Sequence, residues 1–332
     1  MRRISFVYVV LVVCFIVAVC FSFYFYKQAN AYDRKLDAAV SSLPNPTYHF
    51  SLIGEEMNHE YWRLVGDGAK EVEQKHDVFV QYEGPSRSNP EEQLKLLDMA
   101  IKSKVDGIIV QALDENFTPM IDKAVEAGIP VITIDTDSPE SSRAAYIGTD
   151  NYLAGQLAGK ALVEDTNGQA TVGIITGSFN NAHHELRVEG FRDVVEQEDG
   201  IEIVAVEESN ITRVEAEEKA YNILTGHEDI TAFYGTSSYD ASGIVAAAKS
   251  LNRQENLYVI GFDVLDENIE LLEKGDIDVL VEQHPFEMGQ QSIEIMLDLI
   301  KGKSVQDVYH TDASIIRKEN LDMWNNAKGE AP

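Results

Sequence analysis

Short apolar runs and segments with helical spacing alternate along most of the chain. Each apolar run is too short for a helix and therefore predicts a buried strand, while apolar residues that recur every three or four positions predict amphipathic helices. This alternation is typical of βαβ units that build a parallel sheet with right-handed crossovers. The first half of the pattern predicts strands over residues 48–53, 78–82, 107–110 and 131–134, and helices over residues 60–76, 90–103 and 117–127.

The same alternation restarts after residue 150 and predicts a second α/β half of similar design. No repeat of 20–50 residues is visible, which argues against a solenoid. Strands are predicted over residues 171–175, 201–206, 232–234, 257–262 and 279–281, and short ones near 308–311 and 313–316. Helices are predicted over residues 151–164, 185–197, 214–225, 239–250, 268–274 and 285–301. The fold class is therefore α/β, with two lobes that each contain a parallel sheet.

Polar side chains follow two neighbouring strands of the second half. The stretch from residue 257 to residue 285 reads as strand, helix and strand, with Gly275 as the helix C-cap. Asp263 follows the first of these strands, and Gln283 follows the second. Ligands of open α/β sheets bind beyond the carboxyl ends of strands, so both residues stand where a ligand would bind. An equally good interpretation of Asp263 is that it caps the following helix.

The charge of the chain bears on its partners. The formal net charge is −29, and such an excess of acidic groups repels phosphates, so nucleic acid is not an expected partner. Most of this charge is expected to form a solvated acidic surface, which would suit a neutral or cationic ligand. The length of 332 residues is sufficient for two domains with cores of their own.

The N-terminus carries an uncharged apolar run over residues 4–26, which is long enough to cross a bilayer as a helix. Arg2 and Arg3 precede this run, so the positive-inside rule predicts a cytoplasmic N-terminus and an extracytoplasmic remainder. We therefore expect a single-pass anchor within residues 1–30, followed by a stalk over residues 31–46.

A cleaved signal peptide is the competing interpretation of this segment, because residues 29–31 have the small-x-small form of a cleavage site. The apolar run is long for a signal peptide, which favours an uncleaved anchor. The sequence before Cys20 only loosely resembles a lipoprotein cleavage box, and the bulky Phe21 argues against one. Both cysteines, Cys14 and Cys20, lie in this segment, so no disulfide is expected in the exported part.

Signatures of enzymes and cofactor sites are absent from the sequence, which contains no P-loop, GxGxxG, HExxH or GxSxG motif. His183, His184 and Glu185 are the residue types that bind metals, but adjacent residues rarely converge on one ion. We therefore expect no metal and no cofactor. An enzyme is not favoured either, because no nucleophile–base pair can be identified.

Aromatic and polar residues gather in residues 54–62, around the start of a predicted helix. Tyr61 and Trp62 are adjacent there, close to Asn58 and to several carboxylates. Aromatic rings can cover the apolar C–H face of a sugar, while Asn and Asp side chains bind its hydroxyl groups. The alternative is that both rings only pack beneath the loop.

Five motifs together resemble a known family. They are ITID at residues 132–135, GTDN at 148–151, RVEGF at 187–191, VIGFD at 259–263 and EQHPFEMG at 282–289. In this order and spacing, over roughly residues 47–320, the chain resembles the periplasmic sugar-binding proteins of ABC transporters, and most of all the ribose-binding type. The resemblance implies two Rossmann-like lobes joined by three hinge strands, with the ligand enclosed between them.

The resemblance also implies the extent of each lobe. Lobe 1 is expected to comprise residues 47–150 and 284–312, and lobe 2 residues 151–283 and 313–332. The hinge crossings are expected near residues 150–151, 283–284 and 311–313.

Nine residues correspond to contacts that the family makes with its sugar. They come from the first lobe, from the hinge and from the second lobe. The implied ligand-binding residues are Asn58, Tyr61, Trp62, Asp135, Asn151, Glu185, Ser237, Asp263 and Gln283.

Three positions depart from the ribose-binding pattern. Thr136 and Glu185 stand where the ribose binders have arginine, and Ser237 stands where they have asparagine. The loss of two arginines removes fixed bidentate donors, so the resemblance implies a sugar but not ribose itself. Asp135, Glu185 and Asp263 would place three mutually repelling carboxylates around one cavity. This predicts a neutral pentose, hexose or polyol as ligand and the rejection of uronic acids.

The resemblance implies a non-enzymatic, membrane-attached receptor that closes its lobes on a small neutral carbohydrate outside the cytoplasm. The closed form would either deliver the sugar to an ABC permease or dock on a sensor histidine kinase, and an anchor without a lipid box fits the sensory role slightly better. A LacI-type regulator shares this core, but the apolar run occupies the place of its DNA-binding helices.

Overall fold

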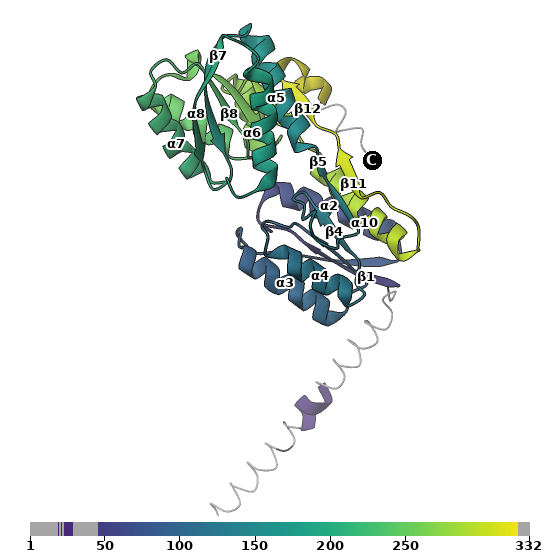
Figure 1. The fold of residues 1–332 in the computed structure, drawn as a ribbon. Coiled ribbons are helices and arrows are strands. Elements are labelled where there is room, and N and C mark those ends of the chain that lie inside the picture. The colour runs from purple at the N-terminus through teal and green to yellow at the C-terminus, as the bar shows by residue number, and fades with distance from the viewer. Residues whose placement is uncertain (1–18, 20, 22, 29–45, 325–332) are drawn as a thin grey trace, which may run out of the picture. The chain divides into compact units, whose positions relative to one another are not determined.

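The computed structural model describes residues 19, 21, 23–28 and 46–324. Residues from Tyr48 onward form one compact unit, which contains two six-stranded sheets (Figure 1). The predicted anchor and stalk fall largely outside the described residues. Within the described ranges, no helix combines the length and the apolar character needed to cross a membrane.

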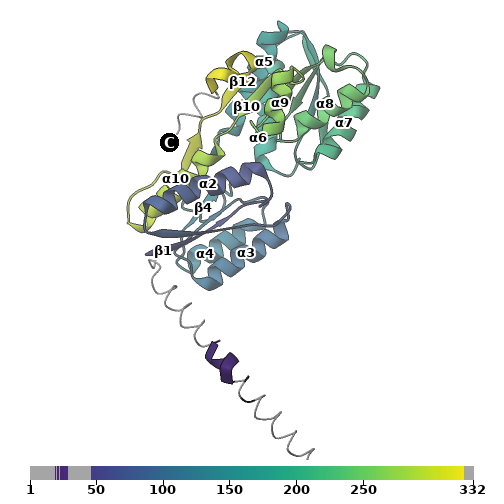
Figure 2. The ribbon, with the colours of Figure 1, turned by 180° about the vertical axis from the view of Figure 1, so that it is seen from behind.

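The first lobe has a fully parallel sheet with helices on both faces. Its strands are β1 (Tyr48–Ile53), β2 (Val78–Glu83), β3 (Gly107–Val110), β4 (Val131–Ile134), β5 (Ala145–Thr149) and β11 (Val308–Thr311). Its helices are α2 (Glu60–Lys75), α3 (Pro90–Ser103), α4 (Phe117–Glu126) and α10 (Pro285–Ile300). The strand order is β11-β5-β4-β3-β1-β2. Apolar residues of α2 and α10 cover one face, and those of α3 and α4 cover the other (Figure 2).

The second lobe repeats this plan, with one antiparallel strand at its edge. Its strands are β6 (Ala170–Thr176), β7 (Ile201–Glu208), β8 (Ala232–Gly235), β9 (Tyr258–Phe262), β10 (Val279–Glu282) and β12 (Ser314–Arg317). Its helices are α5 (Asn151–Thr166), α6 (Ala182–Val195), α7 (Arg213–Gly226), α8 (Asp240–Ser250) and α9 (Asp266–Lys274). The strand order is β12-β10-β9-β8-β6-β7. One core cluster lies under α5 and α6, and the other under α7, α8 and α9.

The chain passes between the two sheets three times: between β5 and α5, between β10 and α10, and between β11 and β12. The first passage is fixed by Asp150, whose side chain accepts a hydrogen bond from the N–H of Leu153 and so caps α5. The residue-by-residue boundaries of the two lobes stay a prediction. The fold class expected from the sequence, two α/β lobes with parallel sheets, is confirmed.

Two elements differ from the expected pattern. Strand β5 is not among the predicted strands, although all five of its residues are buried. The run is short and contains Gly148, which weakens the apolar signal of a strand. Helix α6 begins at Ala182, three residues before the predicted start at Glu185. The earlier start brings His183 and His184 into the helix, and both line the cleft described below.

Reciprocal glycines bring one helix pair in each lobe into backbone contact. A Cβ added to Gly155 of α5 would lie 2.1 Å from the carbonyl oxygen of Arg187 in α6, and one added to Gly190 of α6 would lie equally close to a carbonyl of α5. The first lobe repeats this arrangement through Gly68 of α2 and Gly289 of α10. The absent side chains allow each helix pair to pack closely, and in the second lobe this packing positions the backbone of Arg187.

Replacement of Gly155 by alanine is expected to destabilise the protein, because the new Cβ has no room beside the carbonyl group of Arg187. Overpacking of this kind lowers the free energy of unfolding by about 1–3 kcal/mol. Gly226→Ala at the end of α7 is the matched control, since nothing lies within 4 Å of its Cβ. Urea unfolding measures both variants; equal midpoints would show that the α5–α6 contact does not require Gly155.

Candidate binding cleft

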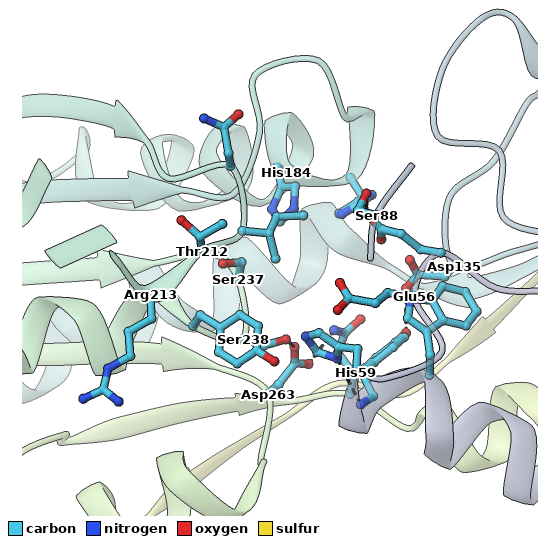
Figure 3. A pocket seen from close by; sticks show the side chains of 18 of the residues that line it. Glu56, His59, Ser88, Asp135, His184, Thr212, Arg213, Ser237, Ser238 and Asp263 are labelled. Atoms are coloured by element: carbon cyan, nitrogen blue, oxygen red, sulfur yellow. Dashed lines mark hydrogen bonds between the residues drawn. The ribbon is translucent and has the colours of Figure 1, made fainter. Parts of the chain in front are cut away.

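A cavity of about 520 Å³ lies between the two lobes (Figure 3). The first lobe lines it with residues of the loop after β1, the start of α2 and the end of β4. The second lobe lines it with residues of α6 and with the loops that follow β7, β8 and β9. Most of these segments follow the carboxyl ends of parallel strands, the usual position of a ligand site in such sheets.

Two aspartates occupy equivalent positions at the strand ends of the two lobes. Asp135 follows β4 and Asp263 follows β9, and both are buried residues that line the cavity. Both have left-handed backbone conformations, with φ of 64° and 68°. Each N–H donates to a carbonyl of the neighbouring strand, to Ile147 at 2.8 Å and to Val281 at 2.9 Å. Backbone held in this sparsely populated region is common at functional sites, and here it directs both carboxylates towards the cleft.

The carboxylate of Asp135 is held by two side chains of its own lobe. Its Oδ1 accepts a hydrogen bond of 2.5 Å from the hydroxyl of Tyr61, and its Oδ2 accepts one of 2.8 Å from Nε2 of Gln111. Burial raises the pKa of Asp135, while the bond from Tyr61 and the charge of Arg187 act in the opposite direction. Burial also raises the pKa of the Tyr61 hydroxyl, which therefore stays protonated and keeps donating to the carboxylate.

The carboxylate of Asp263 is connected to the hinge. It accepts hydrogen bonds from the hydroxyl of Ser238 and from Nε2 of Gln283, the latter at 2.7 Å. The Oε1 atom of Gln283 in turn accepts from Thr149 at 2.8 Å and from Nη2 of Arg187 at 3.1 Å. Gln283 therefore joins both lobes and the cleft in one hydrogen-bonded network.

Arg187 of α6 places a positive charge between the two aspartates. Its side chain lines the cavity and the residue is only 3% exposed. Nε donates to Asn151 and Nη1 donates to the carbonyl of Thr236, both at 2.8 Å, and the guanidinium lies 3.7 Å from the ring centre of Phe262. Three of its five N–H groups are thus used, including the bond to Gln283, which leaves two N–H groups for a ligand.

Aromatic rings form the first-lobe wall of the cavity. Trp62 and Tyr61 both line it, and their ring centres lie 5.7 Å apart in an edge-to-face arrangement. The indole of Trp62 packs against Gly54, where a Cβ would come within 2.7 Å of the ring. His59 and Tyr239 form a further edge-to-face pair across the cleft, with ring centres 5.0 Å apart.

A histidine also connects the lobes. Nδ1 of His183 in α6 lies 2.9 Å from the hydroxyl oxygen of Thr136, which follows β4. Burial and the nearby charge of Arg187 lower the pKa of His183 well below its usual value, so the ring is neutral at physiological pH. Burial, together with His183 and Arg187, likewise holds the neighbouring His184 neutral, and its Nδ1 lies 3.0 Å from the Thr236 hydroxyl.

Six of the nine residues predicted from the sequence line this one cavity: Tyr61, Trp62, Asp135, Ser237, Asp263 and Gln283. Asn151 lies behind the cavity wall, where it is buried and orients Arg187. Whether these residues contact a ligand stays a prediction.

The structure does not bring Asn58 or Glu185 to the cavity. Asn58 is exposed, and its amide donates to the carbonyl of Ser86 at 2.9 Å, so it shapes the loop and does not face the cleft. Glu185 is also exposed and lines a separate hollow on the outer side of α6. In a helix that includes residues 183, 184 and 187, these three side chains face the cleft and residue 185 points away. The expected cluster of three carboxylates that included Glu185 is therefore wrong.

The sequence interpretation gave no role to Arg187, His183, His184 or His59, all of which line the cavity. Arg187 begins the RVEGF motif that carries part of the family resemblance. If the helix had been predicted to begin at Ala182, the spacing of residues 183, 184 and 187 would have indicated that they share one face.

Comparison with known proteins agrees with this geometry. The ribose import binding protein RbsB of Escherichia coli is 24% identical over 287 residues, which cover 86% of this chain and 95% of that protein. The crystal structure of GanP, a glucose-galactose binding protein from Geobacillus stearothermophilus, is 52% identical with a TM-score of 0.81, and the match covers 82% of this chain and 98% of that chain.

A structure described as the XylFII–LytSN complex is 34% identical with a TM-score of 0.77, over 82% of this chain and 98% of that chain. The family model of the periplasmic binding protein domain matches residues 50–304, more than two thirds of the sequence. The chain therefore belongs to the periplasmic binding protein domain family, and the resemblance to its sugar-binding members is confirmed.

Proposed function

We propose that the protein binds a neutral hexose, D-galactose or D-glucose, outside the cytoplasm by closing its two lobes around the sugar. The identity of 52% to a glucose-galactose binding protein supports the choice of hexose. The observation that carries the proposal is the buried set of Asp135, Asp263 and Arg187, which faces one cavity from both lobes. A ligand in contact with both lobes favours the closed population, because only that form makes all of the contacts.

The chemistry of the cleft matches a polyhydroxylated ring. Sugar hydroxyls would donate to the carboxylates of Asp135 and Asp263 and accept from the two remaining N–H groups of Arg187. The indole of Trp62 would cover the apolar C–H face of the ring. Hydrogen bonds to charged groups are stronger than those between neutral groups, so Asp135, Asp263 and Arg187 would supply most of the polar binding energy.

The charges around the cavity favour a neutral ligand over an acidic one. Five carboxylates line it, those of Glu55, Glu56, Asp135, Asp263 and Glu267, against three arginines, of which Arg187 is the buried one. Two of its donors point to neutral amide oxygens and one to a carbonyl, so the guanidinium is already oriented. A carboxylated sugar would bring a further negative charge close to these carboxylates.

Two partners are proposed for the closed form, an ABC permease and a sensor histidine kinase. The sugar-binding protein of a Bacillus halodurans sugar ABC transporter, 26% identical with a TM-score of 0.78, supports the permease. The existence of the XylFII–LytSN complex, at 34% identity, supports docking on a second protein. Sugar-dependent co-purification with a permease or with a kinase ectodomain distinguishes the two outcomes.

Ligand identity is tested by thermal unfolding of the full-length protein with D-galactose, D-glucose and D-galacturonate. A neutral hexose at a hundred times its dissociation constant is expected to add about 2.7 kcal/mol to the unfolding free energy. D-Galacturonate is expected to add nothing measurable, because the carboxylates of the cleft repel it. Tight binding of the uronic acid would contradict the proposed electrostatics of the cavity.

Removal of one aspartate tests the placement of the site. Asp263→Ala is expected to weaken hexose binding by about 1.5–3 kcal/mol, the range for hydrogen bonds to a charged group. Glu185→Arg is the control, and it is expected to leave binding unchanged because Glu185 lies outside the cavity. Calorimetric titration of both folded variants provides the comparison. Unchanged affinity of the Asp263 variant would mean that the sugar binds elsewhere.

We also propose that residues 4–26 anchor the protein in the membrane and are retained in the mature chain. The uncharged run and the two arginines before it support this topology. Mass spectrometry of the mature protein is expected to find its N-terminus at or near Met1. A start at Tyr32 would instead identify a cleaved signal peptide, and a lipid on Cys20 would identify a lipoprotein.

A further inference from the structure

A buried carboxylate outside the cavity holds two of the loops that line it. Asp240, the first residue of α8, is 0% exposed. Its Oδ1 accepts a hydrogen bond of 2.6 Å from the hydroxyl of Ser209, and its Oδ2 accepts one of 2.7 Å from the backbone N–H of Ser237. No lysine or arginine of the described residues forms a salt bridge with it. Asp240 is therefore a buried anion whose partners are the two loops.

The first of these loops follows β7 and has an unusual backbone. Asn210 and Ile211 are consecutive left-handed residues, with φ of 49° and 54°, a conformation that is costly for a β-branched side chain. The hydroxyl of Ser209 accepts from the N–H of Ile211 at 3.2 Å while it donates to Asp240. The carboxylate thus helps to hold a strained turn, and residues 210–213, which follow directly, line the cavity.

The second loop follows β8 and leads to a cleft carboxylate. The hydrogen bond that the Ser237 N–H donates to Asp240 fixes the start of this loop, and Ser237 and Ser238 line the cavity (Figure 3), as does Tyr239. Within this loop the hydroxyl of Ser238 donates to Asp263. Six cavity-lining residues therefore lie in the two loops that Asp240 holds, and one of them, Ser238, orients Asp263.

We propose that Asp240 is a positioning residue for sugar binding, whose negative charge holds both loops in the geometry that the sugar requires. The proposal rests on the proposed sugar-binding function. An ionised carboxylate accepts two strong bonds and donates none. Once neutral, it holds the N–H of Ser237 less firmly, and the Ser209 hydroxyl can turn to the carbonyl of Thr176 at 3.3 Å. The loops must then be ordered when the sugar binds, and this lowers affinity.

The negative charge of Asp240 lowers the stability of the folded protein. Burial raises its pKa to about 6, against the hydrogen bonds from Ser209 and Ser237. Because this folded-state pKa lies above the usual value of about 3.9, the folded protein binds more protons than the unfolded chain between these pH values. The contribution of Asp240 to stability therefore falls as pH rises from about 4 to 6 and stays low above 6. A lower pH is therefore expected to increase the contribution of Asp240 to stability and to weaken sugar binding.

Few other ionisable groups of the described residues face Asp240. Tyr234 of β8 is close enough to interact with it, and burial raises the pKa of that hydroxyl beyond the physiological range. Arg187 and His184 of α6 are connected to it only through Thr236. Burial holds His184 neutral, and arginine stays charged, so neither changes charge between pH 5 and 7.5. Glu55 and Asp135 in the cleft, whose pKa values burial raises, to about 6 for Glu55, are the groups that would add a pH dependence of their own.

The substitution Asp240→Asn removes the charge of the side chain and keeps its shape. D-Galactose is titrated into the full-length protein at pH 7.5 and pH 5, in a detergent without a sugar headgroup, and melting is measured without sugar. We expect at least tenfold weaker binding than wild type at pH 7.5, a smaller change between the two pH values, and a melting temperature that does not fall. Asp229→Asn, at an exposed position of the same lobe, is the matched control and is expected to behave as wild type.

Ser209→Ala provides a second variant, which leaves the carboxylate intact and removes the hydroxyl that it holds; it is also expected to weaken binding. Wild-type affinity and an unchanged pH dependence in Asp240→Asn would overturn the proposal. So would a lower melting temperature together with weaker binding, since that result would assign Asp240 to the fold alone. If the wild type gives no heat with any neutral hexose, the sugar-binding function itself fails, and this inference fails with it.

Discussion

The structure of the cleft depends on the buried cation of Arg187, which forms no salt bridge with a carboxylate of the described residues. The guanidinium of Arg187 is held by Asn151 at the first passage between the lobes, by Gln283 at the second and by the carbonyl of Thr236 after β8. Isolated charges are costly to bury, so a complete set of acceptors is required to keep this one in place. Oε1 of Gln283 also accepts a hydrogen bond from Thr149 of the first lobe. One oxygen atom therefore both holds Arg187 and connects the two lobes. A change of the angle between the lobes therefore alters the position of Arg187, which connects closure with ligand contact.

The two lobes place their cleft carboxylates and pack their helices in the same way. In each, an aspartate in left-handed conformation follows a buried strand and points its carboxylate into the cleft, and in each a pair of glycines allows two helices to touch. Asp135 is fixed by Tyr61 and Gln111, while Asp263 is fixed by Ser238 and Gln283. The first network reaches the second lobe through Thr136, which accepts from Gln111 and lies 2.9 Å from Nδ1 of His183. The second network reaches the first lobe through Gln283 and Thr149, so the carboxylate of each lobe is connected to the opposite lobe.

The sequence was sufficient to predict the strand ends but not the cleft-facing side of a helix. The apolar run before Asp263 and the family resemblance at Asp135 predicted both residues at the ligand site, and both line the cavity. Glu185 was expected at the cavity because it stands where the ribose binders have arginine, but it faces outward on α6, and Arg187, two residues further on, lines the cavity. Strand β5 was missed, since its burial comes from β4 and β11 on either side and not from its own composition. Contacts such as that between Thr136 and His183 join different lobes, so no local pattern could have indicated them.

Several acidic groups at the cleft lower the stability of this protein at neutral pH. Burial raises the pKa of Glu55, Asp135 and Asp240, and all three lie in the cleft or directly support it. Each is less favourable in its charged form in the folded protein than in the unfolded chain, so each lowers stability at neutral pH. At the surface the direction is reversed, as for Asp98, whose pKa is lowered by its hydrogen bonds to Lys102 and Lys123. Neutral groups at these three positions would cost the fold less stability. In the proposed function their charges have a use, because a sugar hydroxyl, or a loop that must meet one, is bound more strongly by a carboxylate than by a neutral acceptor.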